Sequence, residues 1–411
     1  MKRHLLVALA SLCCFLSAGR SQEPPADSSL SVHEWGTFTS IAGAKGEAVV
    51  WSPQAERDDL PSFVEHLRNN QFKGGLQGTI RMETPVLYFY ATHPTTVSVR
   101  VSFAKGLLTE WYPHASAPLT PRQVSDPILD LNATNGQLLW KSILVDPSGT
   151  DNFPKESAAS RYYAARETSA SSVTANSPTG PQREKFLFYR GVSSLDVPVT
   201  ALPQNNRRIL VSNRTQSAIP LAILFERRGT RFGYRILGSV QHSSVVDAPD
   251  LDADLASLAH DLEQILIANG LYPDEARAML QTWNDSWFEE GTRLLYIVPR
   301  PFVDRVLPLT IAPAPSNITR VFVGRLEVVT PATENAVETA FSSGDRSTLV
   351  KYGRFLAPIL QVMIARSHDK TRARQLNAYL NSVYTELYAL LKNGPQNLTA
   401  SRPAPTIISS Q

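Results

Sequence analysis

The sequence has very little cysteine. Its 411 residues include two cysteines, Cys13 and Cys14, both near the N-terminus. They lie in a segment typical of a signal peptide, with two basic residues, small residues at its end, and an apolar run over residues 5–16. That run is shorter than the roughly 20 residues of a membrane span. We expect residues 1–21 to be removed, which excludes disulfide bonds, a cysteine nucleophile and a thiolate metal site from the mature chain.

An excess of charge of one sign is also missing. Three of the 40 basic residues and none of the 37 acidic residues lie in residues 1–21, so 37 of each remain after cleavage. A balanced chain gives no electrostatic reason to expect nucleic acid or an anionic membrane as partner. From the balanced charge we expect no nucleic-acid partner. From the signal peptide we expect a periplasmic or extracellular protein with no membrane span after signal cleavage.

Complete catalytic motifs are lacking as well. His33 and Glu34 begin a sequence similar to the zinc-protease motif, but Thr37 stands where the second histidine is required. No Gly-x-Ser-x-Gly sequence occurs, and the Ser-x-x-Lys spacing of Ser102 and Lys105 falls at the end of a predicted strand instead of on a helix. Gly-rich phosphate loops are absent. We expect no cofactor and no metal.

Strand patterns dominate what is present. Residues 97–103 alternate between apolar and polar side chains, which predicts a strand with one buried face, and residues 86–90 form an apolar run typical of a strand covered on both faces. His93-Pro94-Thr95 lies between them as a turn. We predict that these two strands form the centre of an antiparallel sheet.

The fold class that follows is α+β. Leucines and isoleucines recur at three- and four-residue spacing after Asp250, the predicted N-cap, and Pro273 begins a second helix, so an αα-hairpin is expected. The predicted units are a signal peptide (1–21), a flexible mature N-terminus (22–31), an antiparallel β-sandwich-like domain (32–245) with a mobile Ser/Ala/Thr-rich loop (154–183), an αα-hairpin plus a small β unit packed on that domain (246–332), a helical C-terminal region (333–394) and a disordered tail (395–411).

Carboxylates beside aromatic or arginine residues are the candidate catalytic groups. They are Glu34, Glu83, Glu110, Glu289 and Glu290. Two carboxylates flanked by aromatic rings are typical of glycoside hydrolysis, in which one acts as acid and the other as base or nucleophile. Structural Arg–Glu pairs are the alternative that we favour, because buried carboxylates need counter-ions whatever their role. Glu289 and Glu290 end a predicted helix, where the dipole disfavours acids, so we expect Arg293 or another arginine to compensate.

Aromatic residues offer a second kind of site. The candidate ligand-binding residues are His33, Trp35, Arg81, Trp111, Tyr162, Tyr163 and Trp287. Aromatic rings serve as platforms for glycans or peptides and equally as core residues. Core is the expectation for most of them. Tyr162 and Tyr163 are the exceptions, because they fall in the predicted mobile loop.

Four longer motifs carry a resemblance. They are His33–Phe38 (HEWGTF), Arg81–Tyr90, Thr109–Pro113 and Ser286–Gly291. With them the chain resembles a group of secreted bacterial proteins of unknown function that share an N-terminal HEWGTF motif. The resemblance assigns no catalytic residue. We expect a non-catalytic binding or envelope-associated protein with a glycan or peptide ligand, and the alternative is an extracytoplasmic glycosidase-like hydrolase that needs two of the acids within about 5–10 Å in a cleft.

Overall fold

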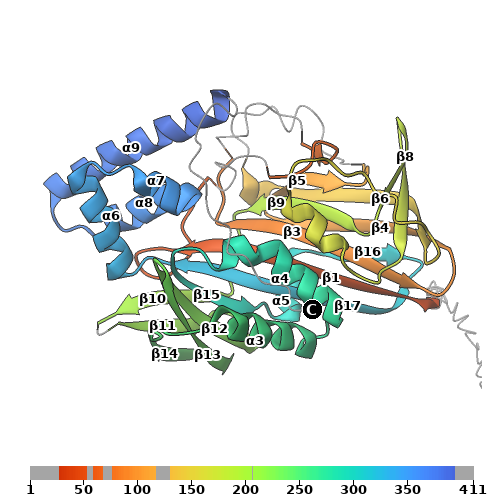
Figure 1. Ribbon diagram of the computed structural model, residues 1–411, viewed down its shortest axis with the longest axis horizontal. Helices are drawn as coiled ribbons and strands as arrows, with labels where there is room; N and C mark the ends of the chain where they lie inside the picture. Colours follow the sequence, from red (N-terminus) through yellow and green to blue (C-terminus); the bar gives the residue numbers. More distant parts are fainter. Residues whose placement is uncertain (1–26, 53–58, 68–75, 117–129, 206, 394–411) are drawn as a thin grey trace, which may run out of the picture.

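The computed structural model of the protein describes residues 27–52, 59–67, 76–116, 130–205 and 207–393 (Figure 1). Within them the chain has the predicted α+β fold, with a large sheet, a small sheet and helices concentrated toward the C-terminal part. The predicted signal peptide (1–21) and the predicted C-terminal tail (395–411) lie outside the described residues. No helix of the described part is long and apolar enough to cross a membrane.

The large sheet has its longest path in the order β13-β12-β15-β17-β1-β3-β9-β5-β6-β4-β16, with β2, β7 and β8 attached beside it. Its strands are β1 (Asp27–Ala42), β2 (Glu65–His66), β3 (Ile80–Ala91), β4 (Thr95–Ala104), β5 (Gly106–Tyr112), β6 (Asn135–Asp146), β7 (Ser172–Ser177), β8 (Gly180–Glu184), β9 (Leu187–Ser193), β12 (Ile219–Arg228), β13 (Arg231–Val240), β15 (Gly291–Ile297), β16 (Leu309–Ala312) and β17 (Pro315–Val328).

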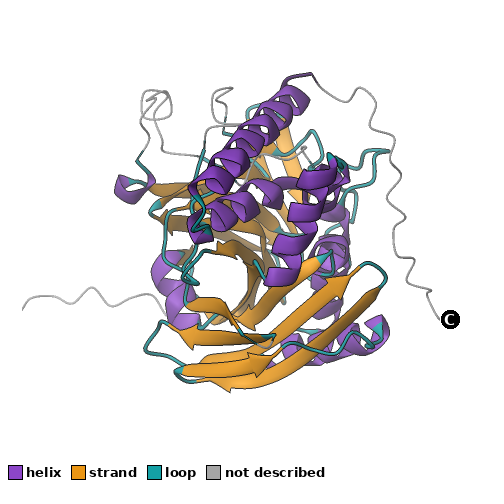
Figure 2. Ribbon diagram, turned by 90° about the vertical axis from the view of Figure 1, so that its left-hand side faces the viewer, coloured by secondary structure: helices purple, strands orange, loops and turns teal. Residues whose placement is uncertain are grey.

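The smaller sheet and the helices complete the fold. The small sheet has the order β10-β11-β14, with β10 (Val199–Gln204), β11 (Arg208–Asn213) and β14 (Ser243–Asp247). The helices are α3 (Leu255–Ala268), α4 (Pro273–Trp287), α5 (Arg300–Val306), α6 (Pro331–Ser343), α7 (Ser347–Tyr352), α8 (Leu356–Arg366) and α9 (Lys370–Asn393), with 3-10 turns η1 (Leu131–Ala133), η2 (Arg161–Arg166) and η3 (Gly353–Phe355). Helices α6 to α9 and the small sheet lie on opposite sides of one end of the molecule (Figures 1 and 2).

The αα-hairpin forms as predicted from α3 and α4. Its first helix starts later than the sequence suggested, because Asp254, instead of Asp250, is the N-cap. The Asp254 side chain accepts hydrogen bonds from the backbone N–H groups of Ala256 and Ser257. The leucine spacing that predicted this helix gives it a buried face that contains Leu258, whereas its start is fixed by the capping geometry.

The predicted pairing of the two central strands is wrong. β3 lies between β1 and β9, and β4 lies between β6 and β16. Phe89 of β3 and Val97 and Val99 of β4 belong to one hydrophobic core, so the consecutive strands contribute to the same interior without being hydrogen-bonded to each other. Side-chain alternation shows which face of a strand is buried, but it does not show the partner of that strand.

β1 occupies the middle of the large sheet. It pairs in parallel with β17 and antiparallel with β3, whereas only an isolated bridge joins Ala42 at its end to Ala48. Trp35 is opposite Val321 on one side and Val86 on the other. The HEWGTF motif therefore lies between β3, which follows it closely in the sequence, and β17, whose paired residues are 286 residues away.

One face of β1 is covered by two different helical layers. Trp35 packs in an aromatic cluster with α3 and α4, whereas Ile41 packs against the C-terminal helices. Successive side chains of a strand alternate between faces, so Thr37 and Thr39 share this face and lie between the two layers. The boundary between the layers is the place where buried charges collect.

The segment 154–183 is not the irregular loop that its composition suggested. It contains η2, and its strand β7 forms an antiparallel hairpin with β8. Ser, Ala and Thr are common in loops, but in β7 they belong to a strand whose buried positions include Val173 and Ala175.

The predicted flexible N-terminus (22–31) is also partly structured, because β1 begins at Asp27.

Candidate functional site

Glu34 is fully buried, and both oxygens of its carboxylate accept hydrogen bonds. Its carboxylate accepts a short hydrogen bond from the Tyr189 hydroxyl and forms an ion pair with Arg320 of β17. A second nitrogen of Arg320 lies 2.9 Å from Asp304 of α5. This carboxylate, placed on β1 by the HEWGTF motif, ties β1 to β9 and β17, as the structural alternative expects.

Buried charges of both signs gather between α4, the sheet and the C-terminal helices, and we call this group the charge seam. Its members are the buried Glu83, Glu327, Arg293, Arg325 and Arg354 and the half-buried Glu289. Arg354 of η3 lies 2.8 Å from Glu83 of β3. Arg325 and Arg293 lie 2.7 and 2.8 Å from Glu327, whose carboxylate they share. The seam thus joins three strands, β3, β15 and β17, to the C-terminal helices.

Arg293 compensates the end of α4, as the sequence predicted. Its guanidinium donates hydrogen bonds to the carbonyl oxygens of Trp287, Glu289 and Glu290, at 2.7, 2.8 and 2.8 Å. A cation at this end of a helix is favourable because the last carbonyl groups have no partner within the helix. The Glu289 carboxylate itself lies 3.8 Å from Arg325.

The carboxyl groups of the seam have different acidities. Burial alone would raise the pKa of Glu83, but Arg354 and neighbouring arginines lower it to about 2. Burial would also raise the pKa of Glu327, and the two arginines that bind it hold that pKa below its usual value. At Glu289 burial prevails over Arg325, so its pKa is raised. Neighbouring carboxyl groups with different pKa values also occur at sites of acid–base catalysis. Whether these groups could act on a substrate therefore depends on the size of the cavity beside them.

The space beside the seam is very small. A hollow of about 20 Å³ is lined by residues that include Glu289, Glu290, Glu327, Lys351 and Tyr352. Such a volume suits about one water molecule. A sugar ring does not fit this hollow, whereas glycoside hydrolysis requires two carboxyl groups that face a substrate.

Glu290 and Glu110 have partners of their own. Lys351 lies 3.1 Å from Glu290, which also accepts the backbone N–H of Gly229 at 2.8 Å. Glu110 of β5 accepts a hydrogen bond from Thr109 at 2.5 Å and is opposite Arg190 in the pairing with β9. The structure therefore brings Glu83, Glu289 and Glu290 toward the seam, and Glu34 and Glu110 take part in separate interactions.

The candidate ligand-binding residues are almost all interior. Those that are buried are His33, Trp35, Arg81, Trp111, Tyr162 and Trp287. Trp35 and Trp287 belong to the cluster under α3 and α4, and Trp111 donates its ring N–H to Glu65 at 2.8 Å. Arg81 helps to lower the pKa of Glu83. As a set they form no exposed platform.

Tyr162 and Tyr163 are part of a packed cluster and not of an exposed loop. The Tyr162 hydroxyl donates to Glu184 at 3.0 Å, and Arg166 lies 2.6 Å from the same carboxylate. Burial raises the pKa of Tyr162 well above its usual value. Tyr163 is half-buried, and its hydroxyl accepts the backbone N–H of Glu156 at 2.9 Å.

His33 is engaged by a residue that sequence reasoning did not single out. Its Nδ1 lies 2.9 Å from Glu275 of α4, and the Tyr90 hydroxyl donates to the same carboxylate at 2.8 Å. Within the described ranges, no group of three or more His, Cys, Asp or Glu side chains is arranged to hold a metal ion.

The partners of the predicted acids were also missed. Arg320 and Arg325 lie in β17, where charged side chains stand between apolar residues, and this pattern indicates buried ion pairs. Arg354 lies within the predicted helical C-terminal region and has no comparable signal. Sequence alone could therefore have indicated that β17 carries buried cations, but not which acids they bind.

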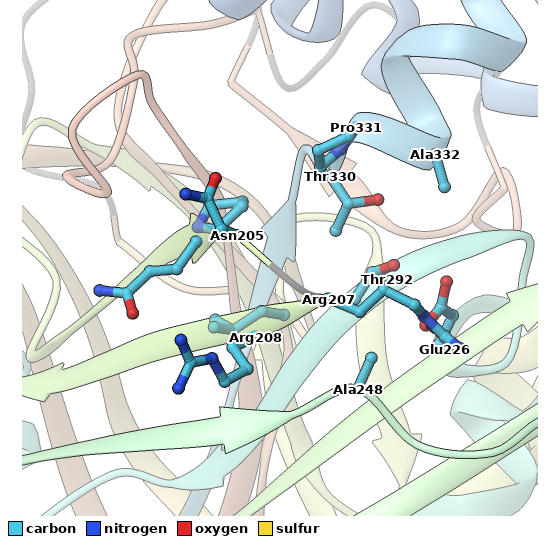
Figure 3. A pocket seen from close by; sticks show the side chains of 12 residues that line it. Asn205, Arg207, Arg208, Glu226, Ala248, Thr292, Thr330, Pro331 and Ala332 are labelled. Atoms are coloured by element: carbon cyan, nitrogen blue, oxygen red, sulfur yellow. Dashed lines mark hydrogen bonds and ion pairs between the residues drawn. The ribbon is translucent and has the colours of Figure 1, made fainter.

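A second, larger opening is lined by none of the candidate site residues that the sequence singled out. A cavity of about 390 Å³ lies between the small sheet, β12, β15 and the start of α6 (Figure 3). It is lined by Pro203, Gln204, Asn205, Arg207, Arg208, Ile209, Glu226, Ala248, Thr292, Thr330, Pro331 and Ala332. Its volume falls within the range of small-molecule sites, which is about 300–1,000 Å³.

Comparisons with known proteins leave the family open. No family model matches the chain, and no curated protein matches it. Among solved structures, it is similar to the yeast delta-COP-I mu-homology domain complexed with a Dsl1 WxWxV peptide, at 8% sequence identity and a TM-score of 0.23. That alignment covers 74% of this chain and 98% of the other. A TM-score this low carries no argument about fold or function.

Proposed function

We propose that the protein is an exported, non-catalytic binding protein and that the cavity beside α6 holds its ligand. The observation that carries this proposal is the cavity itself, which is large enough for a small molecule or the end of a peptide. Most of the atoms exposed in the cavity are apolar, and the side chains of Ile209, Ala248 and Pro331 contribute to this apolar surface. Apolar walls with a few polar groups are the usual composition of a ligand site.

The state of the predicted acids supports a binding role over hydrolysis. Glu34, Glu83 and Glu290 each have a cationic partner within hydrogen-bonding reach, and Glu289 lies beside a hollow that suits about one water molecule. A glycosidase needs two carboxyl groups facing a substrate. Nothing in the described geometry favours that alternative.

The lining also bears on the class of ligand. Glycan sites commonly use exposed aromatic rings, but the described residues of this cavity include none, and the aromatic candidates of the sequence are mostly buried. A small molecule or a peptide end is therefore favoured over a glycan. The place of action that we propose, the periplasm or the cell exterior, rests on the sequence of residues 1–21.

A ligand screen with matched variants tests the proposal. Purified mature protein would be screened against a metabolite and peptide library by thermal shift, and hits would be measured by calorimetry. Ala332 lines the cavity, and Ala332→Leu adds volume there (Figure 3). Ala256→Leu adds the same volume at an exposed position of α3 and serves as control. Hits that bind the wild type and the control but not Ala332→Leu support the proposal, and hits that bind all three equally contradict it.

A further inference from the structure

We infer that the cavity recognises a carboxylate attached to an apolar body, with Arg207 as the anchor of the anion. This inference rests on the proposed function and specifies the ligand of the same site. A free aliphatic acid and the carboxyl terminus of an apolar peptide share this chemistry. The inference follows from the charges at the cavity, the unused hydrogen-bond donors and the apolar walls.

Charge at the cavity is positive overall. Arg207 and Arg208 line it, and Glu226 is its one acidic lining residue among those described. Glu226 is already neutralised by Arg228, whose Nε lies 3.1 Å from it, whereas Arg207 lies farther away at 3.5 Å. Arg208 has an exposed side chain with no ion-pair partner in the described part of the chain. Arg207, Arg208 and Arg228 thus face the single negative charge of Glu226, and an anion entering here would meet a net positive charge.

Arg207 has N–H groups that no described residue uses. One of its terminal nitrogens donates to the carbonyl oxygen of Pro249 at 3.2 Å and to Glu226 at 3.5 Å. A guanidinium carries five N–H groups, and those on the other two nitrogens have no partner among the described residues. Its side chain is 63% exposed and reaches across the cavity toward Glu226 (Figure 3). Arginine suits a carboxylate because two of its N–H groups can bind both oxygens at once.

Thr292 supplies a second donor from the floor of the cavity. Its hydroxyl oxygen accepts an N–H of Arg228 at 3.0 Å, which fixes the oxygen while leaving the hydroxyl hydrogen available. Thr292 is only 2% exposed, and no acceptor for that hydrogen is found in the described structure. A buried hydroxyl in a cavity with a net positive charge is a suitable partner for one carboxylate oxygen.

Apolar side chains of the cavity would contact the hydrocarbon part of the ligand. Pro203 and Ile209 come from the small sheet, and Pro331 and Ala332 come from the start of α6. These side chains offer no hydrogen bonds, so they favour a hydrocarbon body over a polar one. A hydrophilic anion such as inorganic phosphate would leave these walls uncovered.

Calorimetry with matched probes tests the carboxylate preference. The probes are octanoate, octanol and octylamine, followed by an apolar tetrapeptide with a free carboxyl terminus and the same peptide amidated. We expect octanoate to bind at least about tenfold more tightly than octanol, because only the carboxylate can form charge-assisted hydrogen bonds with the arginines. Preference for the tetrapeptide over octanoate, lost on amidation, would identify a peptide as the source of the carboxylate.

Variants separate failure of this inference from failure of the proposed function. Arg207→Gln with Arg208→Gln should reduce octanoate binding to the level of octanol, and Ala332→Leu should weaken both probes. If octanol binds as well as octanoate and Ala332→Leu weakens both, the cavity binds ligands but the carboxylate preference is wrong. If no probe binds the wild type, the carboxylate inference is overturned, and the library screen then decides the proposed function.

Discussion

The guanidinium of Arg354 lies 2.8 Å from the carboxylate of Glu83, although 271 residues separate them in the sequence. Both side chains are at least nine-tenths buried. The pair therefore joins η3, between the C-terminal helices α7 and α8, directly to the middle of the large sheet. A buried pair of this kind is costly to break, because the remaining partner is left as an uncompensated charge.

Removing Arg354 should therefore destabilise the protein strongly. We expect Arg354→Met to lower the free energy of unfolding by about 3–5 kcal/mol, which is typical when one member of a buried pair is removed. Lys351→Met is the matched control, because Lys351 pairs with Glu290 at a partly exposed position and should contribute at most about 1 kcal/mol. Urea unfolding of both variants measures the difference, and equal losses would show that the seam does not stabilise the fold.

Glu83 should make stability fall in acid. Its pKa is about 2 in the folded protein against an ordinary 4.5, so the unfolded chain binds protons more readily. The stability it contributes is present above pH 4.5 and is lost as the pH falls toward 2. Glu83→Gln should be less stable than the wild type at pH 7 and should approach it near pH 2. Urea unfolding across this range measures the effect, and a constant difference would contradict the depressed pKa.

Glu289 should behave in the opposite way. Burial raises its pKa in the folded protein, so the folded state binds its proton more readily than the unfolded chain does. Its contribution to stability is therefore full at low pH and declines as the pH rises through the raised pKa. Glu289→Gln mimics the protonated form and should equal or exceed the wild type in stability at pH 7. A clear loss at pH 7 would mean that the ionised form is the one the seam stabilises.

The fold could be predicted from the sequence in its elements more than in its connections. Periodicity located the αα-hairpin and the strands, because leucines at helical spacing and alternating valines report directly on a buried face. It did not reveal that His33 pairs with Thr319 across β1 and β17, since nothing local encodes a partner so distant along the chain. The predicted β3–β4 ribbon failed for the same reason.

The candidate site was predictable only in part. The acids near arginines were identified, and Arg293 at the end of α4 followed from the helix dipole. The cavity was not predictable, because Arg207, Thr292 and Ala332 come from three segments that meet only in the folded chain. Tyr162 was misjudged because its polar neighbours hide a closely packed aromatic cluster.

Substitution of Tyr162 should destabilise the fold more than substitution of Tyr163, and neither substitution should change ligand binding. Tyr162 is 1% exposed and contacts Phe63, Phe186 and Phe188, so Tyr162→Ala should cost about 3–5 kcal/mol. Tyr163→Ala should cost less, because its ring is only half-buried. Neither folded variant should change ligand binding. Denaturant unfolding and calorimetry check this, and loss of binding in folded Tyr163→Ala would return the site to η2.

The most direct test of the binding role is titration of octanoate into the wild type, Ala332→Leu and Ala256→Leu, with thermal unfolding showing that each is folded. We predict binding to the wild type and to Ala256→Leu, and at least about tenfold weaker binding to Ala332→Leu, because the added leucine occupies the cavity where the ligand body packs. Equal affinity in all three proteins would place binding elsewhere and contradict the assignment of the cavity.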